Sequence, residues 1–363
     1  MKILGIATSS TKSALSQQDA ASFAVKSLGS DASAERGLRN LYRLSSVENR
    51  HTFLSVEGGD KGAFQSFFPP RNRPEELGPT TAERLALFTK GATQLAIPVA
   101  RNALQNSKIE ASEVTHIVTV SCTGFEAPGF DFQIIRELKL PSSVQRTHIG
   151  FMGCHAAVNA LRVAQAFAAQ GGVVLLVCVE LCSLHFSYAE GSDQTVANSL
   201  FSDGAAAVVI ANRQGDSSRT DLIKLIDFGS DIIPDSTDAM AWRVTDNGFQ
   251  MSLSPRVPAL IAGSIEATLA GWLAKRSLSV EKIGGWAIHP GGPRVLDAAQ
   301  RALSLSDQLM SPSRDVLAKH GNMSSPTVLF IIEKLIEMRA PPPWMVLGFG
   351  PGLVAEFGLI DSR

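Results

Sequence analysis

The sequence has no excess of charge of either sign and few cysteines. Its 363 residues carry 33 Lys and Arg against 34 Asp and Glu, a formal net charge of −1. This balance gives no reason to expect nucleic acid or an anionic membrane surface as a partner. The four cysteines show no zinc-type spacing, and a large core needs no disulfides, so we expect reduced thiols and no bound metal.

Targeting and membrane-spanning signals are also lacking. The amino terminus MKILGIATSS has no long apolar core and no cleavage pattern, so no secretory signal is expected. The apolar run VVLLVCVELC at 173–182 is too short to span a bilayer. These absences predict a cytoplasmic protein without membrane insertion. Its composition, 45% hydrophobic and 18% charged, is typical of a globular protein with a large core.

Apolar, β-branched runs alternate with helical periods, which is the pattern of an α/β protein. Buried strands are predicted at 116–120, 173–180 and 204–211. A helix is predicted directly after Cys154, because apolar residues recur there at helical spacing and mark one buried face: Ala157, Leu161, Ala164 and Phe167.

The second half of the chain repeats the order of the first. KHGNMSSPTVLFIIEKL at 319–335 repeats the turn-to-helix step of 148–164, with Ser325 expected to cap the helix and Pro326 to open it. The polar stretch NRQGDSSRTD at 212–221 is interpreted as a linker. The chain is therefore predicted to consist of two similar halves, residues 1–212 and 213–363.

Such a duplication would bring two helix N-termini together, one beside Cys154 and the other beside Asn322. A helix N-terminus lowers the pKa of a thiol, because unpaired N–H groups stabilise the thiolate. His289 leaves a strand and enters a Pro-Gly-Gly turn. Each residue alone is more typical of a core cysteine or a turn residue. Together they would provide a nucleophile, a proton partner and a neutral hydrogen-bond donor.

Five segments, in order, resemble those of type III polyketide synthases, the chalcone-synthase-like branch of the thiolase superfamily. They are GFMGCHAA (150–157), LFSDGAAAVVI (200–210), AIHPGGPRVLD (287–297), GNMSSPTVLF (321–330) and GFGPGL (348–353). The resemblance implies the duplicated thiolase fold, with five αβαβα layers and two pseudo-symmetric halves. It also implies a homodimer, acyl-CoA and malonyl-CoA as substrates, and no cofactor.

The resemblance also implies a role for each catalytic residue. Cys154 would carry the acyl group as a thioester, with His289 as the ionic partner of its thiolate. His289 and Asn322 would donate hydrogen bonds to the enolate formed when malonyl-CoA loses carbon dioxide. The enolate would attack the thioester repeatedly, and the product would cyclise to a pyrone or phenolic ring. No carboxylate base is needed, and no acidic residue stands out near the motifs.

Further residues are expected to contact substrate. Phe201 would lie between the CoA tunnel and the cavity, and Met251 stands where plant members often have a second aromatic gatekeeper. A flexible Met permits a longer channel, which favours a bacterial-type enzyme with an aliphatic starter. For the cysteines at 122 and 182, a cavity wall and plain core remain open. The complete set of expected substrate contacts is Phe201, Cys122, Cys182, Met251, Ser324 and Gly350.

Two other functions share parts of this pattern. A 3-ketoacyl synthase of fatty-acid initiation has the same Cys-His-Asn set but extends once from an acyl carrier protein. The segments at 321–330 and 348–353 favour the polyketide branch over it. A catalytically inactive thiolase-fold scaffold would have lost the set, which is complete here. Arg50 is interpreted either as a ligand of CoA phosphates or as a solvated surface arginine.

Overall fold

The structure is a computed structural model that describes residues 1–11, 14–28, 32–54, 67–73, 75–188, 192–212 and 222–361. The linker expected at 212–221 falls almost wholly outside the described residues. The three strands predicted at 116–120, 173–180 and 204–211 are confirmed as β4 (His116–Ser121), β6 (Val174–Leu181) and β7 (Asp203–Ala211). The helix predicted after Cys154 is confirmed as α6 (Ala156–Ala169).

Nine of the described strands form one hydrogen-bonded series made of two groups, while β9 pairs with β10 and β2 with β3 in separate two-stranded sheets. The series runs β11-β12-β13-β8-β1-β7-β6-β4-β5. Within the described residues two pairs join the groups, Lys2 with Lys224 and Ile3 with Ile223. The strands not yet bounded are β1 (Lys2–Ser9), β5 (Gln145–Gly150), β8 (Ile223–Ile232), β11 (Gly285–Ile288), β12 (Trp344–Gly350) and β13 (Val354–Asp361).

The two groups of strands have the same hydrogen-bonding pattern. In one, β4 is parallel to β6, which pairs antiparallel with β7, which pairs antiparallel with β1. In the other, β11 is parallel to β12, followed by antiparallel β13 and antiparallel β8. The repetition matches the duplicated order of motifs in the sequence.

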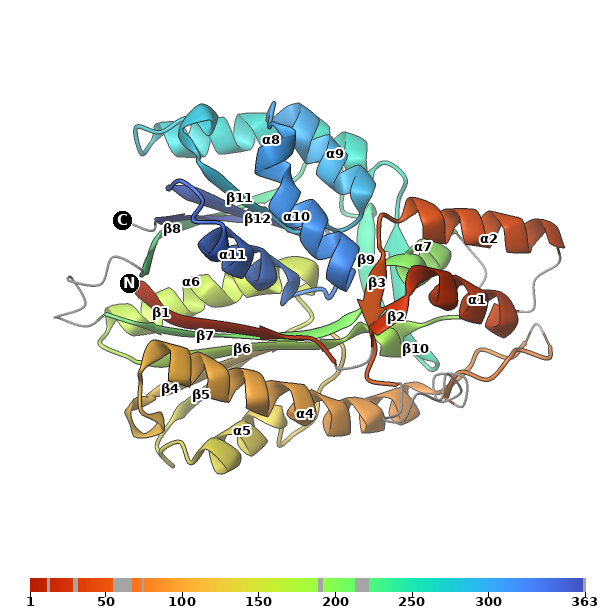
Figure 1. Cartoon of the computed structure of the whole chain (residues 1–363), viewed down its shortest axis with the longest axis horizontal. Helices are drawn as coiled ribbons and strands as arrows, with labels where there is room; N and C mark the ends of the chain where they lie inside the picture. The colour runs from red at the N-terminus through yellow and green to blue at the C-terminus, as the bar shows by residue number, and fades with distance from the viewer. Residues whose placement is uncertain are drawn as a thin grey trace.

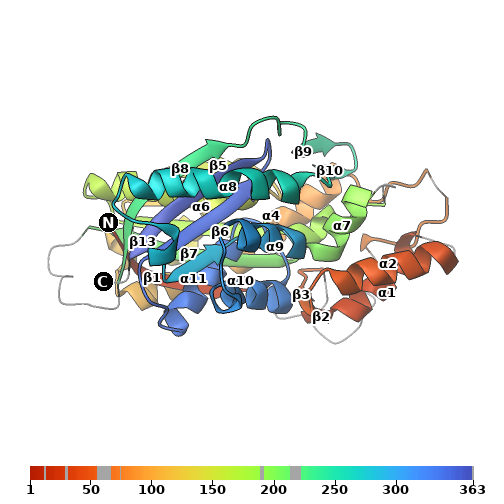
Figure 2. The same cartoon turned by 90° about the horizontal axis from the view of Figure 1, so that it is seen from above.

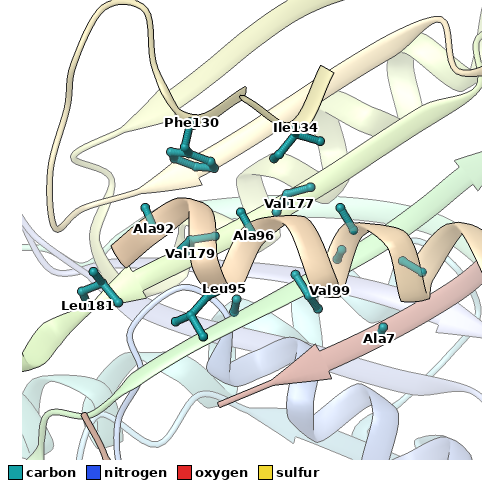
Figure 3. Packing of buried hydrophobic residues seen from close by; sticks show 14 of the residues in the cluster. Ala7, Ala92, Leu95, Ala96, Val99, Phe130, Ile134, Val177, Val179 and Leu181 are labelled. Atoms are coloured by element: carbon teal, nitrogen blue, oxygen red, sulfur yellow. The ribbon is translucent and has the colours of Figure 1, made fainter. Parts of the chain in front are cut away.

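Helices form three layers around these strands, which confirms the predicted five-layer αβαβα fold (Figure 1). The middle layer, α6 and α11, shares one apolar core, and the two outer layers each have their own. In the α4 layer, Figure 3 shows Ala92 and Ala96 beside Val177 and Val179 of β6. The helices are α4 (Thr81–Ser107) and α5 (Phe130–Leu138) on one side, α11 (Thr327–Glu337) in the middle, and α8 (Val257–Ala274), α9 (Pro293–Ala302) and α10 (Asp307–His320) on the other.

Short elements gather at the end of the molecule away from the two termini (Figures 1 and 2). The β9–β10 hairpin and α7 contact each other there, as do α2 and α7. Helix α7 ends directly before Phe201. They are β2 (Ala14–Ser16), α1 (Gln17–Leu28), α2 (Ala32–Leu44), β3 (Asn49–His51), α7 (Ser192–Leu200), β9 (Met240–Thr245) and β10 (Gly248–Leu253).

Helix α8 is an apolar helix that was not predicted from the sequence. Its 18 residues have a mean hydropathy of 1.4, long and apolar enough to cross a membrane by length and composition. One such helix is weak evidence, because helices that cover a sheet pass the same test. Ile261, Ile265 and Leu269 are fully buried in the outer core that α8 shares with α9.

Candidate active site

Cys154 lies in a tight turn that requires glycine at position 153. The turn follows β5 and places Phe151 at φ 60° and Gly153 at φ 76°. A Cβ on Gly153 would lie 2.3 Å from Cδ of Pro351, far inside contact distance. A short 3₁₀ turn over Gly153–His155 then leads into α6. The Met-Gly step before Cys154 therefore lets the chain reverse beneath the C-terminal glycine loop and present the thiol ahead of the helix.

The C-terminal glycine loop packs against this turn. A Cβ on Gly350 would lie 2.2 Å from Cδ2 of His155, the residue after Cys154. Gly350 is buried, and it is not among the residues that line the cavity beside Cys154. Its position supports the shape of the turn, and the expected contact of Gly350 with substrate stays a prediction.

A small cavity opens beside the thiol. Its volume is about 30 Å³, room for only about two waters. Cys122 and Cys182, whose role the sequence left open, are buried and belong to its wall. The predicted site residues that line it are Cys154, Cys122, Cys182, Phe201, Met251 and Ser324.

Backbone hydrogen bonds fix the position of Asn322 beside the Cys154 turn. Its N–H donates to Leu200 O at 2.9 Å, and its carbonyl accepts from Ser202 N–H at 3.0 Å. Its side-chain Oδ1 accepts from Ser324 N–H at 2.8 Å. The side chains of Ser324 and Asn322 also lie close enough to the Cys154 thiol to lower its pKa. Asn322 thus lies at the thiol although it is not part of the cavity wall.

His289 is buried and lacks hydrogen-bond partners for its ring. It follows β11, its backbone N–H donates to Leu347 O at 2.7 Å, and its exposed fraction is 1%. Within the described part of the chain neither ring nitrogen has a partner, so the imidazole is not hydrogen-bonded to Cys154. Burial, together with the charge of His155, lowers the pKa of His289 to about 3. The imidazole is therefore neutral.

The thiol of Cys154 is also neutral, contrary to the expectation from its helix position. Burial raises its pKa to about 11, more than the hydrogen bonds from Ser324 and Asn322 lower it, and the charge of Glu180 raises it further. Desolvation penalises the thiolate, and at this site it outweighs the helix start. The surroundings of Cys154 and of His289 therefore each favour the uncharged form of the side chain.

A buried carboxylate, Glu180, lines the same cavity and was missed from the sequence. Burial raises its pKa to about 6, despite four groups that donate to it. Its oxygens accept from Thr123 Oγ1 at 2.6 Å and from Ser325 Oγ at 2.7 Å. The other two donors are Cys122 N–H, at 3.0 Å, and Ser121 Oγ, at 3.4 Å. The one available signal was an acidic residue inside the apolar run at 173–182.

The contact with Glu180 also corrects the prediction for Ser325. Its hydroxyl was expected to cap the helix that follows, but it donates to Glu180 instead. The N-cap position of α11 is Pro326, which has no side chain able to cap. Because Ser325 lies three residues after Asn322, this bond ties the asparagine segment of the second half to β6 of the first.

Two aromatic rings also line the cavity. Trp242 of β9 and His185 both line it, and their rings pack edge to face with their centroids 4.6 Å apart. The indole N–H donates to Cys122 O at 3.3 Å, which fixes the ring against β4. Met251 lines the cavity together with these rings, and the longer channel expected from it stays a prediction.

Arg50 has neither of the two roles expected from the sequence. Its exposed fraction is 8%, so it is not a solvated surface residue. Its guanidinium is bonded to Gln17 and to backbone carbonyls at the end of α7, so it has no free face for a phosphate.

Comparison with known proteins gives consistent matches over the whole chain. The model of chalcone and stilbene synthases, N-terminal domain, matches residues 1–213, and that of the C-terminal domain matches residues 225–362. An alpha-pyrone synthesis polyketide synthase-like protein of Mycobacterium tuberculosis, Pks18, is 32% identical over 99% of this chain and 90% of its own length.

Two further relatives agree with these matches. The 3,5-dihydroxyphenylacetyl-CoA synthase of Streptomyces toyocaensis is 29% identical over 99% of this chain and 90% of its own length. The crystal structure of PKS-I from the brown alga Ectocarpus siliculosus superposes with a TM-score of 0.90 at 28% identity. The superposition covers 99% of this chain and 97% of the other.

Proposed function

The chain belongs to the family of chalcone and stilbene synthases and is a type III polyketide synthase, and from this premise we propose that Cys154, His289 and Asn322 carry its decarboxylative Claisen condensation. The observation that carries the proposal is the pairing of two features. The Asn322 side chain lies near enough to the Cys154 thiol to lower its pKa. The buried His289 ring keeps both nitrogens unpaired, which is costly unless a ligand uses them.

Loading of the starter begins from neutral partners. In the proposed step, Sγ of Cys154 attacks the carbonyl carbon of an acyl-CoA while its proton passes to His289. The tetrahedral intermediate then collapses, the C–S bond to CoA breaks, and the CoA thiolate takes up the proton. A neutral imidazole with an unpaired nitrogen can accept this proton without first losing one of its own.

Extension uses the same donors for a different charge. Malonyl-CoA loses carbon dioxide, and the electron pair of the broken C–C bond forms an enolate. An N–H of His289 and the amide of Asn322 donate to the enolate oxygen, and each such donor is worth roughly 10²–10³ in rate. The enolate carbon attacks the Cys154 thioester and releases the thiolate, so the chain grows by two carbons.

Separating the two half-reactions tests the residue roles. Cys154→Ala should abolish an acyl adduct, detected as added mass on the peptide containing residue 154, and should abolish product. Asn322→Ala should still load the acyl group but lose malonyl-CoA decarboxylation by roughly 10²-fold or more. An adduct that persists in Cys154→Ala, or wild-type decarboxylation by Asn322→Ala, overturns the assignment.

The proposed substrates are an acyl-CoA starter and malonyl-CoA extender units. The names of the relatives, an alpha-pyrone synthesis protein and a dihydroxyphenylacetyl-CoA synthase, support a pyrone or phenolic product. The purified protein should make products with two or more malonyl-derived units from CoA thioesters alone, as judged by mass spectrometry. A single extension that requires malonyl carrier protein would replace this proposal with fatty-acid initiation.

We also propose a cytoplasmic homodimer whose halves divide at residues 212 and 213. Among the described strands β5 pairs only with β4, so its other edge is open to a second copy. Exposed apolar side chains occur in the neighbouring segments of the chain: Phe125 after β4, Phe132 on α5 and Met152 after β5 are 51%, 41% and 39% exposed. Sedimentation at micromolar concentration should show a dimer, and Phe132→Arg should weaken that dimer.

A further inference from the structure

The guanidinium of Arg50 is buried, and no carboxylate of the described residues is hydrogen-bonded to it. It lies on β3, and all of its recorded hydrogen-bond acceptors are uncharged. Nη1 donates to Asn198 O at 2.8 Å and to Phe201 O at 3.2 Å, and Nη2 donates to Ser199 O. On its other side, Gln17 Oε1 accepts from Nε at 3.0 Å and from Nη2 at 2.6 Å. The guanidinium therefore binds two carbonyls in the last turn of α7 and the first carbonyl after the helix.

Burying a charge of this kind is costly, so its persistence calls for a reason. Desolvation lowers the pKa of Arg50, and the nearby Tyr42 and Asp203 only partly offset it. A guanidinium offers five N–H donors in a fixed planar fork, whereas a lysine offers three on a flexible stem. Only the fork reaches one side-chain oxygen and three backbone carbonyls together. The side chain thus fixes the exit of α7 more rigidly than a lysine would.

The segment that Arg50 holds is the one that places Asn322. Residues 200–202 pair with Asn322 in parallel, through Leu200 O and Ser202 N–H. In an extended segment, neighbouring carbonyls point to opposite sides. Phe201 O therefore faces Arg50, while Leu200 O and Ser202 N–H face Asn322. A continuous run of hydrogen bonds therefore connects Arg50, through the Phe201 segment, with Asn322, whose side chain lowers the pKa of the Cys154 thiol.

We propose that Arg50 is a positioning residue for the condensation, which acts by fixing the Phe201 segment and thereby the amide of Asn322 at the reacting sulfur. The inference rests on the proposed role of Asn322. It assigns Arg50 no contact with substrate and none with CoA phosphate. A shift of about 1 Å in a reacting or stabilising group can cost roughly 10²-fold in rate, so a loosened fork is expected to act on catalysis more than on binding.

The test compares Arg50→Lys with a matched control, Arg84→Lys. Arg84 is also a buried arginine, 5% exposed, and it donates to the backbone carbonyls of Pro79, Leu184 and Phe186. None of these carbonyls belongs to the Asn322 segment. Each full-length variant is measured for malonyl-CoA decarboxylation (kcat and KM), for the rate of Cys154 acylation and for Tm.

For Arg50→Lys we expect kcat for decarboxylation to fall about 10- to 100-fold, with KM for malonyl-CoA and the acylation rate within about threefold of wild type. For Arg84→Lys, acylation and decarboxylation should fall together, in proportion to the folded fraction. Combining Arg50→Lys with Asn322→Ala should add little to the loss in Asn322→Ala, because both changes act on the same amide.

Three results would overturn the proposal. If Arg50→Lys raises KM in a salt-dependent manner, Arg50 binds CoA phosphate. If its two activities fall together as in Arg84→Lys, Arg50 only supports folding. If Asn322→Ala decarboxylates like wild type, the role of Asn322 fails, and this inference fails with it. Should Arg50→Lys not fold, Gln17→Met removes one anchor of the fork, and its kcat should fall selectively in the same way.

Discussion

The buried carboxylate of Glu180 makes stability depend on pH in a way that one substitution can isolate. Its pKa is raised from 4.5 in the unfolded chain to about 6 in the folded protein. At about 1.4 kcal/mol per pKa unit, this difference amounts to about 2 kcal/mol. Because the folded state binds the proton more tightly, this contribution is fully present below pH 4.5. It is lost as the pH rises through 6.

Glu180→Gln resembles the protonated side chain at every pH. All four recorded partners of Glu180 donate to it, but the hydroxyls of Thr123 and Ser325 can rotate and accept from an amide. The free energy of unfolding of the variant, minus that of wild type, should therefore rise by about 2 kcal/mol between pH 4 and pH 7.5. Asp203, whose pKa burial also raises to about 6, is present in both proteins and cancels.

Urea unfolding at fixed protein concentration measures this difference, since a dimer would make stability depend on concentration. Glu266→Gln removes an exposed carboxylate on α8 and serves as the control. A difference between Glu180→Gln and wild type that stays constant over this pH range would refute the reasoning. A fall in that difference with rising pH would mean that the hydrogen bonds, not burial, dominate the pKa of Glu180.

Four further substitutions test the turn and the cavity. Gly153→Ala should lower the free energy of unfolding by more than about 2 kcal/mol, because the strain of a positive φ adds to the clash with Pro351. Gly171→Ala, also at positive φ but with open space around it, should cost less, as comparison of Tm values will show. Trp242→Ala should allow longer starters or longer products, and an unchanged product profile by mass spectrometry would contradict a wall role. Cys122→Phe should shorten the product while an alkylating reagent still labels Cys154.

Much of the architecture could be predicted because local patterns report it directly. Buried strands such as β6 are continuous apolar runs, and the apolar period after Cys154 identified α6. The order of the cysteine, histidine and asparagine segments also predicted the candidate site. Glycines beside these segments show where the chain can turn. A helix cap was harder to predict, because Ser325 has a competing partner, Glu180, 145 positions away.

The sequence by itself determined the five-layer fold, the family and the identity of the candidate nucleophile, because each depends on the order and spacing of residues along the chain. Only the tertiary structure decided that the Cys154 thiol and the His289 imidazole are neutral, that Glu180 lies in the cavity wall and that Arg50 is buried. These properties depend on desolvation and on partners from distant segments. Neither is a property of any short stretch of sequence, since both arise only when the two halves pack against each other.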